Sequence, residues 1–172
     1  MFPPKALVIA TSLLSLVEAI PANKPRAASD GARLTVYWGA EDDTTTLSNV
    51  CADPSYDIVN LAFLNYFFSD GGYPSLSLGS LDGPSQAQQA AGATALQDGT
   101  SLVSAIKACQ NAGKLVLLSM GGEAQYADVT LSGDSQGQQI ANTLWNLFLG
   151  GTSESALRPF GSLKLDGLDI GN

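Results

Sequence analysis

Four apolar runs divide the chain after residue 32, and each has the length of a β-strand. The runs at 56–64 and 114–122 are apolar at almost every position, with little alternation between apolar and polar residues. Strands with this pattern are buried on both faces, which is typical of parallel sheets covered by helices. The other runs span 33–39 and 163–170.

Two segments between these runs carry apolar residues at helical spacing. The first spans 100–113, with Thr100 or Ser101 as a possible N-cap and Gly113 as the stop. The second spans 135–151 and also ends in glycine. Strands that alternate with helices indicate βαβ units and therefore an α/β fold.

The connection at 69–99 is long and rich in Gly, Ser, Ala and Gln. A loop of this length in a compact domain is usually functional or disordered. We therefore expect this connection to be either functional or disordered.

The N-terminal residues 1–19 have the layout of a secretory signal peptide, with Lys5 before an apolar stretch at 6–17 and a cleavage site after Ala19. That stretch is shorter than the roughly 20 residues that a membrane-spanning helix requires, and the alternative explanation is a buried core helix. Residues 20–32 are rich in Pro and Ala and indicate a linker, which leaves one domain at 33–172. We expect a secreted, extracellular protein that is not attached to a membrane once the signal peptide is removed.

The composition excludes several classes of function. Hydrophobic residues make up 45% of the chain and charged residues 14%, which is typical of a globular protein. The formal net charge of −8 repels phosphate backbones, so nucleic acid is not an expected partner. The chain has no histidine and only 2 cysteines, which excludes His-dependent triads and most zinc sites. We expect neither a metal nor a cofactor.

Short motifs follow one another in a fixed order along this domain. They are YWG at 37–39, LSNVC at 47–51, YDIVNLAFLN at 56–65, CQNAGKLVLLSMGG at 109–122, LWNLFLGG at 144–151 and LDGLD at 165–169. In this order and at these separations they resemble the class III, hevamine-type chitinases of glycoside hydrolase family 18. The resemblance covers about 33 to 172, which is nearly all of the chain after the linker.

The resemblance implies a TIM (β/α)8 barrel whose active site lies at the C-terminal ends of the strands. The four runs would be the first four βα units, so we expect an incomplete barrel. Its first and fourth strands would be unpaired edges. The resemblance also implies the activity of a glycosidase: hydrolysis of β-1,4-linked N-acetylglucosamine, with chitin or its oligosaccharides as partners and carbohydrate metabolism as the setting.

The motif of the family along the fourth strand is Asp-x-x-Asp-x-Asp-x-Glu. The Glu is the general acid, and the N-acetyl group of the substrate is the nucleophile, so catalysis is substrate-assisted and retaining. Asp166 and Asp169 occupy the first two positions and imply supporting catalytic roles, although a turn acid and a strand-end acid are the alternative. Gly171 stands at the third Asp position, and the Glu would follow Asn172. We therefore expect the chain as given to be inactive.

Other positions match residues that line the substrate cleft. The resemblance implies contacts with substrate for Tyr37, Phe63, Gly121 and Gly122, although Phe63 is also compatible with plain core packing. Glu123 follows the paired glycines and would be either a cleft carboxylate or a solvated loop acid. The alternative function is a non-catalytic, lectin-like chitin-binding protein or an inhibitor of the same fold.

Cys51 and Cys109 precede the second and third strands by a few residues. Neighbouring parallel strands start at the same end of a sheet, so both thiols should lie at the end opposite the site. We expect them to form a disulfide, and a buried pair of free thiols is the alternative.

Overall fold

The computed structural model describes residues 33–40, 45–79, 81–122 and 127–171. The expected signal peptide and linker at 1–32, and Glu123, lie outside the described residues. Every helix within the described ranges is too short or too polar to cross a membrane.

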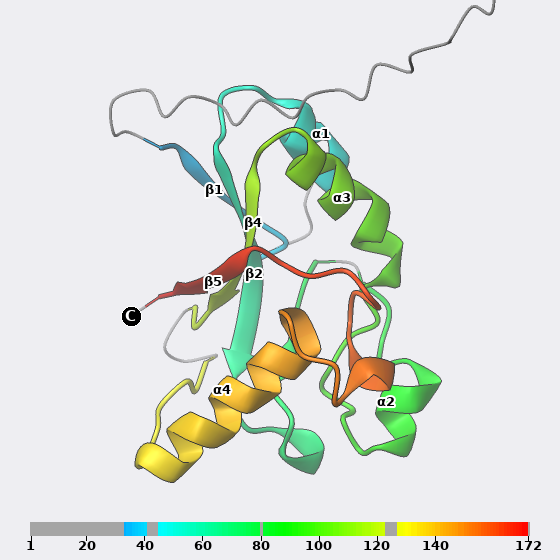
Figure 1. Ribbon diagram of the computed structural model, residues 1–172, viewed down its shortest axis with the longest axis vertical. Coiled ribbons are helices and arrows are strands. Elements are labelled where there is room, and N and C mark those ends of the chain that lie inside the picture. The colour runs from blue at the N-terminus through cyan, green and yellow to red at the C-terminus, as the bar shows by residue number, and fades with distance from the viewer. Residues whose placement is uncertain (1–32, 41–44, 80, 123–126, 172) are drawn as a thin grey trace, which may run out of the picture.

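A parallel sheet forms the centre of the structure (Figure 1). Its strands lie in the order β1 (Thr35–Trp38), β2 (Ile58–Tyr66), β4 (Leu115–Met120) and β5 (Gly167–Ile170), and each neighbouring pair is parallel. A two-residue strand, β3 (Ser75–Leu76), pairs antiparallel with the end of β2. The four predicted strands are confirmed, and β1 and β5 are the two edges among the described residues.

Two of the helices were predicted, with longer bounds than the structure has. They are α3 (Val103–Asn111) and α4 (Asp134–Phe148). The expected cap by Thr100 or Ser101 is wrong, because residues 100–102 form a 3-10 turn, η2, and α3 starts without a side-chain cap. The predicted stop at Gly113 is confirmed: α3 ends at Asn111, and Gly113 follows with φ +80°, a conformation that glycine adopts at low cost. Helix α1 (Leu47–Ala52) was not predicted, since its six residues are too few to show a period.

The long connection at 69–99 is not the plain loop that its composition indicates. It contains η1 (Asp70–Gly72), β3 and α2 (Gln86–Ala90), and α2 begins with a capping box between Ser85 and Gln88. The buried core residues of this segment include Leu76, Leu78, Ala93 and Leu96. These elements are too short to give a hydrophobic period, so the composition alone was misleading.

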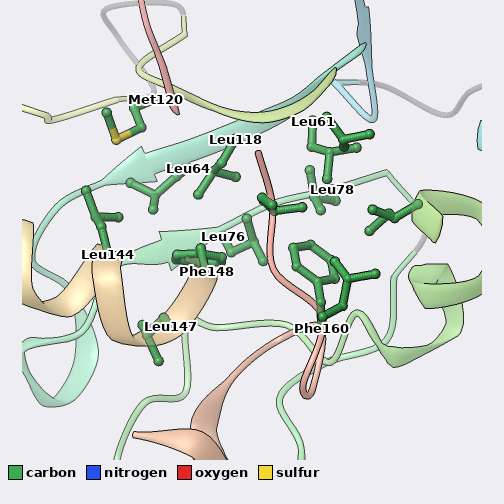
Figure 2. Close-up of a cluster of buried hydrophobic side chains, with 14 of the residues drawn as sticks. Leu61, Leu64, Leu76, Leu78, Leu118, Met120, Leu144, Leu147, Phe148 and Phe160 are labelled. Atoms are coloured by element: carbon green, nitrogen blue, oxygen red, sulfur yellow. The ribbon is translucent and has the colours of Figure 1, made fainter. Parts of the chain in front are cut away.

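The two faces of the sheet differ. On one face, Val59 and Leu61 of β2 and Val116 and Leu118 of β4 are completely buried. Figure 2 shows Leu61, Leu64 and Leu118 of this face with Phe148 of α4 and with Phe160. These residues belong to one hydrophobic cluster.

The opposite face carries the alternate residues of each strand. The register places Tyr37, Asn60, Leu117 and Gly167 at one level of the sheet, and Ala62, Ser119 and Asp169 at the next. Tyr37, on the edge strand β1, is 51% exposed, whereas Asn60, Ala62 and Ser119 on the inner strands β2 and β4 are buried. This open face is the one that points inward in a closed barrel.

Cys51 of α1 and Cys109 of α3 form a disulfide, which confirms the predicted pairing. Both helices lead into the N-terminal ends of strands, α1 into β2 and α3 into β4. The bond therefore joins the two helices at the edge of the sheet opposite the C-terminal strand ends.

Arg158 fastens the chain that connects α4 to β5. Its side chain is only 8% exposed, and all five of its hydrogen bonds go to backbone carbonyl oxygens. The acceptors are the carbonyls of Asn146 (2.6 Å), Leu149 (3.0 Å), Gly151 (3.1 Å), Gly161 (2.7 Å) and Leu163 (2.6 Å). One guanidinium thus holds the end of α4, the turn after it and the approach to β5.

Glu154, in the same connection, is partly buried. Its Oε2 atom is buried and has no hydrogen-bond partner among the described residues. Burial raises the pKa of Glu154 above its ordinary value, because the charged form loses solvation.

The substitution Glu154→Gln should raise the melting temperature at pH 7. The folded state holds the proton of Glu154 to a higher pH than the unfolded state, so its contribution to stability is present at low pH and is lost as pH rises through the raised pKa. The gain from Glu154→Gln should therefore shrink toward pH 4. Asp82→Asn, at an exposed position, is the matched control. A destabilised Glu154→Gln variant at pH 7, or a gain independent of pH, would contradict this.

Candidate active site

The C-terminal ends of β1, β4 and β5 lie at one edge of the sheet, because the strands are parallel and in register. Each of the three strands is followed by glycine: Gly39 after β1, the pair Gly121 and Gly122 after β4, and Gly171 after β5. This edge is where active sites of open and closed α/β sheets form.

Asp169 is held by two side chains from other strands. Its Oδ2 atom accepts a hydrogen bond from the hydroxyl of Tyr37 at 3.0 Å and another from the hydroxyl of Ser119 at 2.8 Å. Ser119 is 1% exposed, so this hydrogen bond fixes the carboxylate from the inside of the sheet, while Tyr37 reaches it from the solvent side. The three residues form a network across β1, β4 and β5.

Ser119 was not among the predicted site residues. The signal for it is a polar residue in the otherwise apolar run of β4, at the same level of the sheet as Asp169. Only the register of strands far apart in the sequence shows that the two side chains face each other.

An aromatic wall lies beside this network. The rings of Tyr37 and Phe63 have centroids 6.0 Å apart and an interplanar angle of 35°. A Cβ atom on Gly122 would lie 3.6 Å from the Phe63 ring, so the bare backbone of Gly122 borders the same wall. Phe63 is partly exposed and lies outside the hydrophobic cluster of the described residues, which argues against plain core packing. The structure thus brings together three of the four predicted substrate-binding residues.

Gly121, the fourth predicted substrate-binding residue, allows two segments of backbone to approach each other closely. It is buried and has φ +111°, and a Cβ atom there would lie 2.8 Å from the carbonyl oxygen of Gly171. Only glycine permits this approach between the ends of β4 and β5. The amide of Gly171 also donates to the carbonyl of Met120 at 3.0 Å.

Asp166 lies apart from this network. It precedes β5, and its Oδ2 atom accepts hydrogen bonds from the amide of Val116 at 2.8 Å and from the side chain of Gln110 at 3.1 Å. These contacts fasten the start of β5 to β4 and α3, at the end of the sheet opposite Gly171. Its surroundings match the alternative of a turn acid better than a role in the cleft.

Within the described ranges, no group of three or more Cys, Asp and Glu residues is arranged to hold a metal ion. At the end of β5, Gly171 presents no side chain, and the nearest carboxylate along the strand is that of Asp169. The arrangement can therefore orient a polar substrate between an aromatic wall and a fixed carboxylate.

No protein-family model matches the chain. It is 62% identical over 172 residues to Endochitinase 3 of Metarhizium robertsii, which covers all of this chain and 53% of that protein. In structure it is similar to a chitinase from Ipomoea carnea, with a TM-score of 0.64, 33% identity, and coverage of 81% of this chain and 46% of the other. It is also similar to a xylanase and α-amylase inhibitor protein from Scadoxus multiflorus, with a TM-score of 0.61, 33% identity, and coverage of 81% and 45%.

The chain thus spans about half the length of the curated relatives it matches, and its sheet corresponds to the first half of a TIM barrel. Taken with the strand order, these likenesses show that the chain belongs to the chitinases of glycoside hydrolase family 18 and corresponds to their N-terminal half.

Proposed function

We propose that the open face of this sheet forms one wall of a chitin-hydrolysing cleft. The observation that carries the proposal is the network of Asp169 with Tyr37 and Ser119, directly beside the Tyr37–Phe63 wall. Sugar rings present apolar faces that pack on aromatic rings and hydroxyl groups that need hydrogen-bond partners. The similarity to proteins named endochitinases supports β-1,4-linked N-acetylglucosamine as the sugar.

In this proposal the residues described here bind and orient. Tyr37 and Phe63 pack against the substrate, and Gly122 lets its backbone come close to a sugar unit. Asp169 is a positioning residue, because Tyr37 and Ser119 hold its carboxylate within the sheet, one strand level below Gly171. The reaction is substrate-assisted and retaining, with the N-acetyl oxygen of the substrate attacking the anomeric carbon as a general acid protonates the departing oxygen.

Gly171 limits what the chain can catalyse. The family motif places an Asp at this position to stabilise the cationic oxazolinium intermediate, and glycine has no carboxylate to do so. Asp169 is not expected to replace it, because it lies two residues earlier on β5 and its Oδ2 atom is already held by Tyr37 and Ser119. We therefore propose that the chain as given does not turn over chitin.

The purified 172-residue chain should release no product from N-acetylglucosamine oligomers above background. The Gly171→Asp substitution alone should not restore turnover, because a positioned general acid contributes a further factor of about 10² to 10⁴. Product release is followed by chromatography of labelled oligomers. Clear turnover by the unaltered chain, abolished by Asp169→Asn, would show that another acid is at work.

A second candidate function is non-catalytic. The similarity to a xylanase and α-amylase inhibitor protein favours an inhibitor on the same fold, and a lectin-like chitin-binding protein is the other non-catalytic possibility. Saturable retention on chitin without product would support the lectin-like function. Dose-dependent inhibition of a xylanase or an α-amylase would support the inhibitor.

Secretion belongs to the same proposal, since polymeric chitin lies outside the cell that digests it. It rests on the layout of residues 1–19, and the N-terminus of the exported chain tests it. An exported chain that begins at Ile20 is expected, whereas retention of the chain with residues 1–19 intact would contradict it.

A further inference from the structure

A polar cavity of about 330 Å³ lies beside α4. Its lining comes from the turn at η1 with Tyr73, from one side of α4, and from Glu154. Figure 1 shows α4 at the lower left of the view, at the periphery of the molecule. Tyr37, Phe63 and Asp169 are not part of this lining, which we call the α4 cavity.

The side of α4 that lines the cavity is polar. Gln139, Asn142 and Thr143 are three and four residues apart, so they lie on one face of the helix. Gln139 and Asn142 are exposed, and amide side chains both donate and accept hydrogen bonds. Asn146 is fixed already: its Oδ1 accepts from the amide of Ser153 at 3.1 Å, and its Nδ2 donates to the carbonyl of Asn142 at 2.9 Å.

Glu154 gives the cavity an unmet hydrogen-bond acceptor. Its Oε2 atom is buried and has no partner among the described residues, whereas buried polar atoms in native proteins are nearly always paired. Its raised pKa agrees with a carboxyl group that has lost water and gained no partner. Because Oε2 has almost no accessible surface, a ligand reaches the carboxyl group only through the part of Glu154 that lines the cavity.

The residues that line the α4 cavity are better suited to some classes of ligand than to others. It contains no Lys or Arg, which disfavours an anion, and its single carboxylate is poor for Ca²⁺, which usually takes six to eight oxygen ligands with several carboxylates. The amides and the hydroxyl disfavour an apolar ligand. The volume lies at the lower end of the range of about 300–1,000 Å³ for small-molecule sites.

We propose that the α4 cavity is a second carbohydrate site, which binds one neutral saccharide unit. The sugar hydroxyls would donate to Glu154 and exchange hydrogen bonds with Gln139 and Asn142, and the Tyr73 ring is the aromatic part of the lining. Such a site would hold a polysaccharide through residues other than those of the cleft. The inference stands on the cavity and does not require the proposed chitinase function.

Titration of the ¹⁵N-labelled chain with N-acetylglucosamine tests this site locally. Saturable shifts are expected at the backbone amides of 139–143 and 153–154. The double variant Gln139→Ala/Asn142→Ala should weaken binding about tenfold or more, since each lost hydrogen bond is worth about 1 kcal/mol and 1.4 kcal/mol is tenfold. Alanine favours the helix, so the fold is retained.

Two further variants serve as controls for the titration. Gln138→Ala removes an exposed neighbour on α4 that does not line the cavity, and Tyr37→Ala alters the cleft alone. In both variants, the sugar should shift the amides of 139–143 and 153–154 with the affinity of the unaltered chain. Absence of saturable shifts would overturn the proposal, as would equal affinity of the double variant and Gln138→Ala. Saturation by Ca²⁺ but not by the sugar would also overturn it.

Discussion

Removal of the Cys51–Cys109 disulfide should lower the free energy of unfolding by about 4 kcal/mol, from the chain-entropy cost of an open loop of this size. The bond joins residues 58 apart in sequence, and it connects α1 to α3, which pack together at the N-terminal edge of the sheet. Without it, the unfolded chain gains conformational freedom that the folded chain does not share. Urea denaturation of Cys51→Ser/Cys109→Ser against the unaltered chain measures the difference.

Reduction provides the matched control. Dithiothreitol should destabilise the unaltered chain by a similar amount and leave the double variant unchanged. A double variant within about 1 kcal/mol of the unaltered chain would show that packing of α1 on α3 suffices without the covalent link, contrary to the loop-entropy expectation.

The substitution Arg158→Ala should cost about 3 kcal/mol or more of stability, since each buried polar group left unsatisfied costs about 1–3 kcal/mol. The guanidinium is buried and supplies donors to five carbonyl oxygens of the connection between α4 and β5. Several of these acceptors would lose a partner at once. Thermal and urea denaturation, followed by circular dichroism, measure the loss.

Two further variants separate geometry from charge. Arg158→Lys keeps the charge but has a single ammonium group, which cannot reach all five carbonyls, so an intermediate loss is expected. Lys107→Ala removes a cation from an exposed position of α3 and should change stability little. If Arg158→Ala and Lys107→Ala had equal stability, the carbonyl contacts of Arg158 would contribute nothing.

The sequence predicted the parallel strands well because burial on both faces leaves a continuous apolar run, as in β2 and β4. It predicted α3 and α4 because each is long enough to show a helical period. It missed α1, α2 and β3, which have six, five and two residues and owe their structure to capping and to tertiary contacts.

The positions of the candidate site residues were only partly predictable from the sequence, and their roles remain predictions. Tyr37, Phe63 and Gly122 lie together as the resemblance implies, and the motif position of Asp169 leads to the same edge. The role of Ser119 depends on strand register, and that of Arg158 on the path of a turn, neither of which has a local signature. The two acids of the LDGLD motif, Asp166 and Asp169, lie near opposite ends of β5 and have different hydrogen-bond partners. Their spacing in the sequence does not show this difference.

The most direct test of the central claim, that this sheet forms half of a chitinase site, is the activity of a completed barrel. Residues 33–171 would replace the matching segment of the Metarhizium robertsii endochitinase, with the rest of that protein retained. The chimera with Gly171→Asp should hydrolyse N-acetylglucosamine oligomers. The chimera that keeps Gly171 should be slower by about 100-fold or more, because the loss of one electrostatic contact to a charged intermediate usually costs this much in rate. A folded Gly171→Asp chimera without activity beside an active parent, or equal rates with and without Gly171→Asp, would contradict the account.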